Sequence, residues 1–398
     1  MRIAYIDPTP IPGTSPPALQ ILHTVDALGE CGVEVELVTP LPRRQAEPSK
    51  LLAREISSYV DFNYLPDLRK RWWNPSSSNK PFYWQAARVL KKLKVHGVLV
   101  RNLKLAEYLL KKRGMPPIFF ETHELFAQSF TEHHGLDSWG KRRKLKKIER
   151  REKFVYEHCA GLIGITQSLL DDIHERYGIE TPSVVSPDGV DMHLASKAAP
   201  SRNKPKPVLL YLGSLHPWKG VETLIHAMEE INGAQLVIAG GNDKRIVDLQ
   251  NLAEEISVSS KVTFLGPVPP AERFDIIAQA DICLLPLTQS SIGSRYTSPL
   301  KLFEYLAMGK PIVTANVPAL REVLKHGQNA LLVPPENANA IAAAVNQLLN
   351  NDALRNQLGA AAAELAKSYS WEARAKIITR FMTQTLTAPK RLSRPSMI

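Results

Sequence analysis

The chain has 398 residues, 44% of them hydrophobic, and a formal net charge of +11 at pH 7. This length can fill the cores of two domains, and this apolar content excludes a chain that is disordered throughout. The three cysteines are sparse and far apart, which argues against a disulfide framework and against a structural zinc site. The positive charge favours anionic partners, namely nucleotide-sugars, nucleic acid or an acidic lipid surface.

The first residues, MRIAYIDP, begin directly as an apolar strand and lack the charged and apolar regions of a secretion signal. No stretch of the sequence approaches the roughly 20 apolar residues that are needed to span a bilayer. We therefore expect a cytoplasmic protein.

Short apolar strands alternate with helical stretches through the first half of the chain. We expect strands at 3–6, 33–38, 97–100, 118–121, 161–166 and 183–185, helices at 18–29 and 82–93, and irregular structure at 39–73. Such an alternation predicts a parallel sheet that is wound by right-handed crossovers.

One histidine of this half directly follows a strand. In FFETHELF, His123 comes just after the expected strand 118–121, and the ends of parallel strands are where cleft residues lie. The residues alone also allow a local capping or packing role for this side chain. His133 and His134 lie in a polar stretch that we interpret as a solvated loop.

The densest basic run is 141–151, KRRKLKKIERR, which carries eight Lys or Arg residues and one acid, Glu149. The flanking sequence looks helical, so a solvated helix face is one interpretation. Docking on an anionic membrane surface is the other, since each basic residue near such a surface contributes about 1 kcal/mol. We do not expect nucleic-acid binding.

A second set of strands and helices follows a stretch rich in Ala, Ser, Lys and Pro at 195–206, which we interpret as a linker. The expected strands are 208–214, 235–239, 262–265, 282–286 and 311–314, and 371–382 is a final amphipathic helix. The basic tail, 388–398, is expected to be mobile. Two open sheets that face each other would place the carboxyl ends of their strands around one cleft.

Two motifs of the second half suit a phosphorylated ligand. Lys219 ends the loop GSLHPWKG, from which a lysine can reach a diphosphate, although a solvated loop lysine is the alternative. Ser298 and Pro299 are expected as the N-cap and first residue of a helix whose N-terminus suits an anionic phosphate. Glu304, about a turn and a half further along, could accept hydrogen bonds from a pair of sugar hydroxyls, and a solvated surface glutamate is the alternative.

Taken in order, GSLHPWKG, LVIAGG, VTFLGPVP and SPLKLFEYLAMGKPIV resemble the donor-binding half of a GT-B glycosyltransferase, and above all glycosyltransferase family 4, the retaining, metal-independent group. The resemblance covers nearly the whole chain. It implies an α/β fold of two Rossmann-like domains with parallel sheets facing across a cleft. It implies an N-terminal acceptor-side domain at 1–194, a linker at 195–206 and a C-terminal nucleotide-sugar-binding domain at 207–370. A helix at 371–387 would cross back to the N-terminal domain, and a mobile tail would follow at 388–398.

The same resemblance implies which residues act. Catalytic roles fall to His123, Lys219 and Glu304, with no metal and no cofactor, and Glu121 or Glu124 could act on an acceptor hydroxyl. Donor contacts fall to Gly13, Thr14, Gly213, Ser214, Gly240, Val268, Arg295, Ser298, Pro299, Leu300 and Lys301.

The sequence departs from the family pattern at several points. Ser214 stands where many members carry an arginine, and Tyr296 stands where many carry the first of two glutamates. Arg295 could supply the missing positive charge, and a solvated loop arginine is the alternative. The loop that holds Gly13 has one glycine and many prolines, so a stiff turn without ligand contact is also open.

The resemblance implies a retaining enzyme that moves a sugar, a hexose by expectation, from a UDP-sugar or GDP-sugar to an acceptor. The expected acceptor is a glycan or lipid-linked glycan of a cell-surface polysaccharide or glycolipid, reached by peripheral docking of 141–151 on the inner face of the membrane. The alternatives are a sugar-nucleotide epimerase, a phosphorylase, or a scaffold that binds sugar nucleotides without catalysis.

Overall fold

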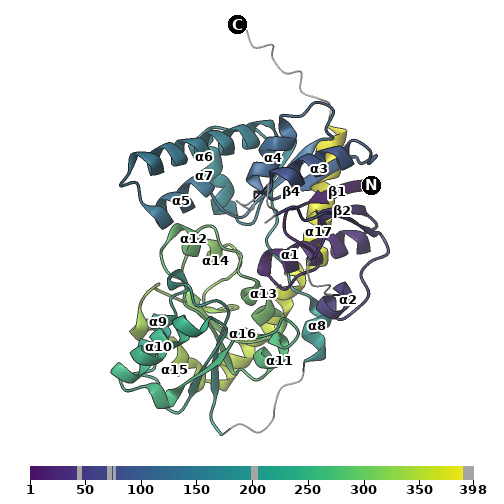
Figure 1. The fold of residues 1–398 in the computed structure, drawn as a ribbon. Coiled ribbons are helices and arrows are strands. Elements are labelled where there is room, and N and C mark those ends of the chain that lie inside the picture. The colour runs from purple at the N-terminus through teal and green to yellow at the C-terminus, as the bar shows by residue number, and fades with distance from the viewer. Residues whose placement is uncertain (43–46, 70–73, 75–77, 199–204, 389–398) are drawn as a thin grey trace.

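The computed structural model describes residues 1–42, 47–69, 74, 78–198 and 205–388, and it divides them between two parallel sheets flanked by helices. The first sheet has seven strands in the order β3-β2-β1-β4-β5-β6-β7, and the second has six in the order β10-β9-β8-β11-β12-β13. Figure 1 shows the N-terminal domain, in purple to teal, stacked on the green C-terminal domain. The expected fold class is confirmed.

The N-terminal sheet consists of β1 (Arg2–Ile6), β2 (Glu34–Pro40), β3 (Val60–Leu65), β4 (Gly97–Val100), β5 (Ile118–Thr122), β6 (Gly161–Gly164) and β7 (Ser183–Val185). Its helices are α1 (Pro16–Glu30), α2 (Pro48–Leu52), α3 (Lys80–Leu90), α4 (Leu103–Leu110), α5 (Phe126–His134), α6 (Trp139–His158), α7 (Gln167–Tyr177) and α8 (Met192–Lys197). The inner strands are buried along their whole length, which explains their unbroken apolar sequences.

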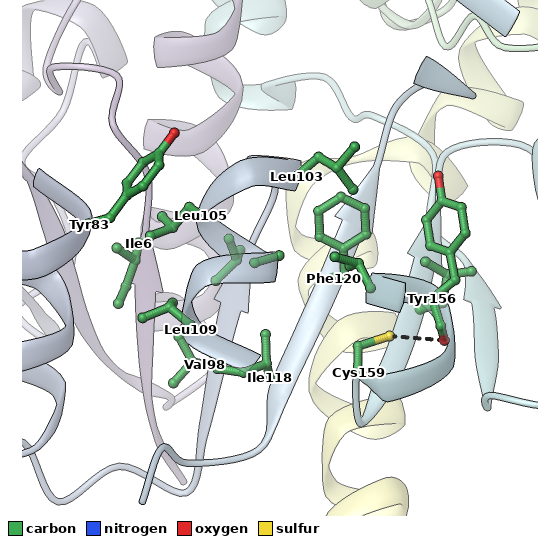
Figure 2. Close-up of a cluster of buried hydrophobic side chains, with 14 of the residues drawn as sticks. Ile6, Tyr83, Val98, Leu103, Leu105, Leu109, Ile118, Phe120, Tyr156 and Cys159 are labelled. Carbon is green, nitrogen blue, oxygen red and sulfur yellow. Dashed lines mark hydrogen bonds between the residues drawn. The ribbon is translucent and has the colours of Figure 1, made fainter. Parts of the chain in front are cut away.

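One face of this sheet carries a large apolar core. Figure 2 shows strand residues such as Ile6 and Phe120 packed beneath Leu105 and Leu109 of α4 and Tyr156 of α6. All five side chains are essentially inaccessible to solvent. This packing fixes the strand ends at which the polar residues of the site begin.

The C-terminal sheet consists of β8 (Val208–Leu212), β9 (Gln235–Ala239), β10 (Val262–Gly266), β11 (Ile282–Leu285), β12 (Ile312–Ala315) and β13 (Leu331–Val333). Its α-helices are α9 (Val221–Ala227), α10 (Asp243–Glu255), α11 (Arg273–Ala278), α12 (Ser291–Ser294), α13 (Leu300–Ala307), α14 (Pro318–Arg321), α15 (Ala338–Leu349) and α16 (Asp352–Ala366). Short 3₁₀ turns lie at Pro217–Lys219, Ser259–Lys261 and Lys367–Tyr369.

The last helix, α17 (Trp371–Thr387), leaves the C-terminal domain and packs against α1 and the N-terminal sheet (Figure 1). Trp371 stacks on His23 of α1 with ring centroids 5.3 Å apart, and Ile378 and Phe381 join the apolar cluster on this face of the sheet. The expected mobile tail lies outside the described residues, apart from Ala388.

The structure corrects several expected elements. The stretch 39–73 is not wholly irregular, because it contains α2 and the edge strand β3, of which only the first and last residues are buried. His133 and His134 end helix α5 instead of lying in a loop. Helix α8 occupies the first residues of the expected linker, 195–206. Pro299 is the N-cap of α13, one residue later than expected, and Ser298 precedes the helix.

The two domains contact each other directly. Glu322, after α14, accepts hydrogen bonds from the backbone N–H groups of Gln167 and Ser168 at the N-terminus of α7, at 2.6 and 2.9 Å. Asp172 of α7 receives the Arg295 guanidinium, with Nε 2.8 Å from Oδ2, and the Tyr296 hydroxyl at 2.7 Å. These contacts hold the loop that precedes α13 against the N-terminal domain.

Candidate active site

A pocket of about 700 Å³ lies at the carboxyl edge of the C-terminal sheet. The loops that follow β8, β9 and β10 line it, together with the start of α10. Four predicted donor contacts are among its lining residues, namely Gly213, Ser214, Gly240 and Val268. Parallel sheets bind ligands at this edge.

Glycines allow the loops of this pocket to approach each other closely. Gly240 has φ +114°, and a Cβ placed on it would lie 2.2 Å from the carbonyl oxygen of Gly213. Gly213 itself has φ +140°, and its Cβ would lie 2.5 Å from Lys301 Nζ. A side chain at either position would collide with these neighbouring atoms, so the loops could not approach each other as closely.

Lys219 ends the 3₁₀ turn after β8 and is 8% exposed. Its ammonium lies 3.6 Å above the Trp218 ring, and it has no hydrogen-bond or ion-pair partner among the described side chains. Burial lowers the pKa of this group to about 7. A buried cation without an anion is costly, so the residue is poised to receive an anionic group.

Helix α13 supplies the second cation and the predicted carboxylate. Lys301 and Glu304 are both buried, and Glu304 Oε1 lies 2.9 Å from Nε of Arg273 at the start of α11. The Glu304 carboxylate is therefore held in place on one side, which leaves its other oxygen available to a hydroxyl group.

On the N-terminal side, His123 follows β5 as expected, and its Nε2 lies 2.6 Å from Oε1 of Glu121. The same carboxylate accepts a hydrogen bond from Arg374 of α17 at 2.7 Å and one from the Tyr5 hydroxyl at 3.3 Å. Burial alone would raise the pKa of Glu121, but Arg374, His123 and Arg101 lower it well below its usual value. Glu121 stays ionised and orients the His123 ring.

Asp188 connects the two halves of the site. Its backbone N–H donates to Ser298 Oγ at 2.9 Å, and its carboxylate accepts from Gln20 at 2.7 Å. A cavity of about 290 Å³ between the domains is lined by Asp188, Ser298, Pro299 and Arg374, among others. Leu300 follows as the first residue of α13 and packs against the apolar cluster around α1.

Three predicted donor contacts lie apart from this assembly. Arg295 is engaged by Asp172 and does not join Lys219 and Lys301. Thr14 is exposed in the loop between β1 and α1, and its side chain makes no hydrogen bond within the described residues. Gly13 lies beside Thr14, and a Cβ on it would approach the Pro10 carbonyl at 3.1 Å.

Arg273 and Arg374 are functional candidates that the sequence did not reveal. Each stands in an ordinary amphipathic stretch, and the carboxylate that each holds lies far away in the chain. Their only sequence signal is an arginine on the apolar side of a helix, which becomes informative once the helix is placed.

A second pocket, of about 470 Å³, lies in the N-terminal domain under α6. Phe126 and Phe130 supply aromatic surfaces, and Tyr83, Asn102 and Glu124 supply polar groups. Ser129 Oγ, which also lines the pocket, is buried without a hydrogen-bond partner among the described residues. Aromatic faces with hydroxyl, amide and carboxylate groups suit a ligand rich in hydroxyls.

Two family models match the chain, one in each domain. Residues 18–194 match "Glycosyltransferase Family 4", and residues 206–351 match "Glycosyl transferases group 1". Together the two matches span most of the chain, and the break between them begins within α8.

The chain is also similar to curated proteins. It is 30% identical over 244 residues to a D-inositol 3-phosphate glycosyltransferase of Corynebacterium efficiens, a match that covers 56% of each chain. It is 30% identical over 243 residues to a phosphatidyl-myo-inositol mannosyltransferase of Mycobacterium leprae, which covers 58% of this chain and 61% of that protein. The chain thus spans about half the length of the curated relatives it matches.

Solved structures share the fold. A sucrose-phosphate synthase of Thermosynechococcus elongatus superimposes with a TM-score of 0.78 at 20% identity, over 98% of this chain and all of that one. HepE of Anabaena, in complex with UDP and glucose, superimposes with a TM-score of 0.72 at 15% identity, over 96% and 99%. Each domain of this chain thus matches a glycosyltransferase family model, and the two domains together share the fold of these solved structures.

Proposed function

We propose that the protein is a retaining, metal-independent glycosyltransferase that moves a sugar from a nucleoside diphosphate to an acceptor. The observation that carries the proposal is the pair of buried, unpartnered lysines beside the backbone-lined pocket of the C-terminal domain. HepE, which shares the fold, binds UDP and glucose, and this supports a uridine nucleotide-sugar as the first donor to test.

The chemistry assigns a task to each group. The bond between the anomeric carbon and the phosphate oxygen breaks, and negative charge grows on the departing diphosphate. Lys219 and the free N–H groups at the start of α13 stabilise that charge. Glu304 accepts hydrogen bonds from sugar hydroxyls, and His123, held by Glu121, contacts the transferred sugar.

The acceptor side of the proposal rests on α6. Residues Arg142, Arg143, Lys144, Lys146 and Lys147 are exposed on this helix, and Trp139 at its start is 70% exposed. None of the helices that the structure describes has the length and apolar character to cross a bilayer. We infer that α6 docks on an anionic leaflet, and that the pocket beneath it receives the head group of a lipid-linked acceptor.

The activity is tested with purified protein, a panel of UDP- and GDP-sugars, and EDTA in every reaction. We expect hydrolysis or transfer with at least one donor, and an NMR spectrum that shows the anomeric configuration of the donor retained in the product. Saturable donor binding without turnover on any acceptor pool would contradict the enzyme and leave a binding protein. Inversion of the anomeric carbon would contradict the retaining mechanism.

The membrane contact is tested by flotation with vesicles of neutral phosphatidylcholine, with and without an anionic phospholipid. We expect salt-reversible binding to the anionic vesicles only. Replacing the five named basic residues of α6 with glutamine should abolish it. A matched control replaces five exposed lysines elsewhere, Lys91, Lys92, Lys94, Lys325 and Lys367, and should still bind. Equal losses in both variants would refute a specific role of α6.

A further inference from the structure

Lys301 occupies an unusual place for a lysine. It is the second residue of α13, and its ammonium lies 3.9 Å above the ring of Tyr211 in β8. The residue is 8% exposed, and Nζ has no hydrogen-bond partner among the described residues. The side chain is therefore aimed at the backbone of Gly213, the residue at which the donor pocket begins.

Tyr211 fixes this arrangement. Its hydroxyl donates to the carbonyl oxygen of Ser214 at 2.6 Å, so one ring positions both the lysine and the loop. Ser214 is the position at which many family members have an arginine. The ammonium of Lys301 thus lies beside the loop in which Ser214 stands in place of that arginine.

Two cations share this part of the site without an anion between them. Burial and the neighbouring charge of Lys219 lower the pKa of Lys301 well below its usual value, and Glu304 only partly opposes this effect. Glu304 is itself paired with Arg273. The two ammonium groups repel each other when both are protonated, and a ligand with more than one negative charge would offset this repulsion.

Arg295, the other candidate for the missing charge, is held elsewhere. Its guanidinium pairs with Asp172, and its backbone carbonyl accepts from Thr166 at 2.8 Å, both in the N-terminal domain. Moving it to the donor pocket would break this interdomain contact.

We propose that Lys301 supplies the cation that is missing at position 214 and, together with Lys219, clamps the diphosphate of the donor. This inference rests on the proposed function and adds to it a residue with a defined partner group. A nucleoside monophosphate offers one phosphate to two cations, so Lys301 should discriminate between diphosphate and monophosphate.

Isothermal titration calorimetry with UDP, GDP, UMP, GMP and inorganic pyrophosphate tests the clamp. We expect Lys301→Met to weaken binding of the preferred nucleoside diphosphate at least tenfold and binding of its monophosphate much less. Lys301→Arg should retain part of the affinity, and Arg295→Met should stay within about twofold of the wild-type protein. Because Lys301→Met removes a buried amine that has no hydrogen-bond partner among the described residues, its thermal midpoint should not fall, and this verifies the fold.

The number of protons taken up on ligand binding is a second measurement, and a purely structural role of Lys301 would not change it. At pH 8, titrations in buffers of different ionisation enthalpy should show that the wild-type protein takes up more protons with UDP than Lys301→Met does. Unchanged diphosphate affinity in Lys301→Met, or an equal loss in Arg295→Met, would overturn the inference. If the wild-type protein binds pyrophosphate through Lys301 but no nucleotide, the clamp stands and the proposed nucleotide donor is wrong. Binding of neither overturns both.

Discussion

The carboxyl edges of the two sheets differ in how their buried charges are paired. At the N-terminal edge, Glu121 is matched by Arg374, and both side chains are 2% exposed. At the C-terminal edge, Lys219 and Lys301 are buried without an anion of their own, while the one nearby carboxylate belongs to Arg273. A buried ion pair stabilises the fold, whereas a buried cation without an anion favours the binding of an anionic ligand. The first edge is therefore structural support for its histidine, and the second is the candidate ligand site.

The largest test of this comparison removes a matched charge. Arg374→Met removes the ion-pair partner that lies 2.7 Å from the buried Glu121 carboxylate, and the loss of one partner of a buried pair costs about 3–5 kcal/mol of unfolding free energy. Urea denaturation measures it. Arg380→Met, an exposed arginine on the same helix, is the control and should stay within about 0.5 kcal/mol. If Arg374→Met were equally mild, the N-terminal edge would not be a structural pair. Adding Glu121→Gln to Arg374→Met should restore part of the stability.

Removing an unmatched charge should do the reverse. Lys219→Met is expected to lower kcat about 10²–10³-fold, because the departing diphosphate loses a preorganised cation. The same change should not lower the unfolding free energy of the free protein, since no partner is left behind. Single-turnover assays and urea denaturation of the same preparation give both numbers. A stability loss comparable to that of Arg374→Met would show that Lys219 has a partner within the fold.

The pH dependence of stability sharpens the same distinction. The pKa of Lys219 is about 7 in the folded chain and about 10.4 when unfolded. Between these values the unfolded chain binds more protons, so this group makes the unfolding free energy rise with pH, by up to about 1.4 kcal/mol per unit. The unfolding free energy of the wild-type protein should therefore rise relative to that of Lys219→Met from pH 7.5 to 8.5. A constant difference would mean that Lys219 is charged in the free protein.

The smallest effect is expected at the contact between the domains. The Asp172–Arg295 pair is partly exposed, with 18% and 40% of the side chains accessible, so Asp172→Asn should cost only about 0.2–1 kcal/mol. Thermal unfolding detects the shift, and Asp171→Asn, which carries the same charge change at the neighbouring exposed residue, is the control. A loss of unfolding free energy above about 2 kcal/mol would show that this pair contributes as much as a buried ion pair does.

Local signals in the sequence were sufficient for most elements of the fold. The inner strands are continuous apolar runs, and those at 97–100 and 235–239 agree with the structure residue for residue, as does the short edge strand at 183–185. The edge strand β3 was missed because its sequence, VDFNYL, mixes polar and apolar residues, and only its two end residues are buried. It therefore lacks the apolar run that reveals an inner strand.

The site could be predicted only where its residues lie within one motif. The loop with Gly213 and Lys219 and the helix with Lys301 and Glu304 are each contiguous, and the fold brings them together. Arg374 could not be assigned, because its partner, Glu121, lies 253 residues earlier and no local pattern joins them. The partner of Arg295 was missed for the same reason.

The crossing of α17 has a consequence for how the protein is made. The N-terminal domain emerges from the ribosome long before residue 374 is translated, so Glu121 is without its arginine through that interval. The seven-stranded sheet is likewise without the apolar surface that α17 adds to it. Domains generally fold as units during synthesis, N-terminal first. Here the N-terminal domain is completed only after α17 has been made, and the ring of His123 gains its final alignment only then.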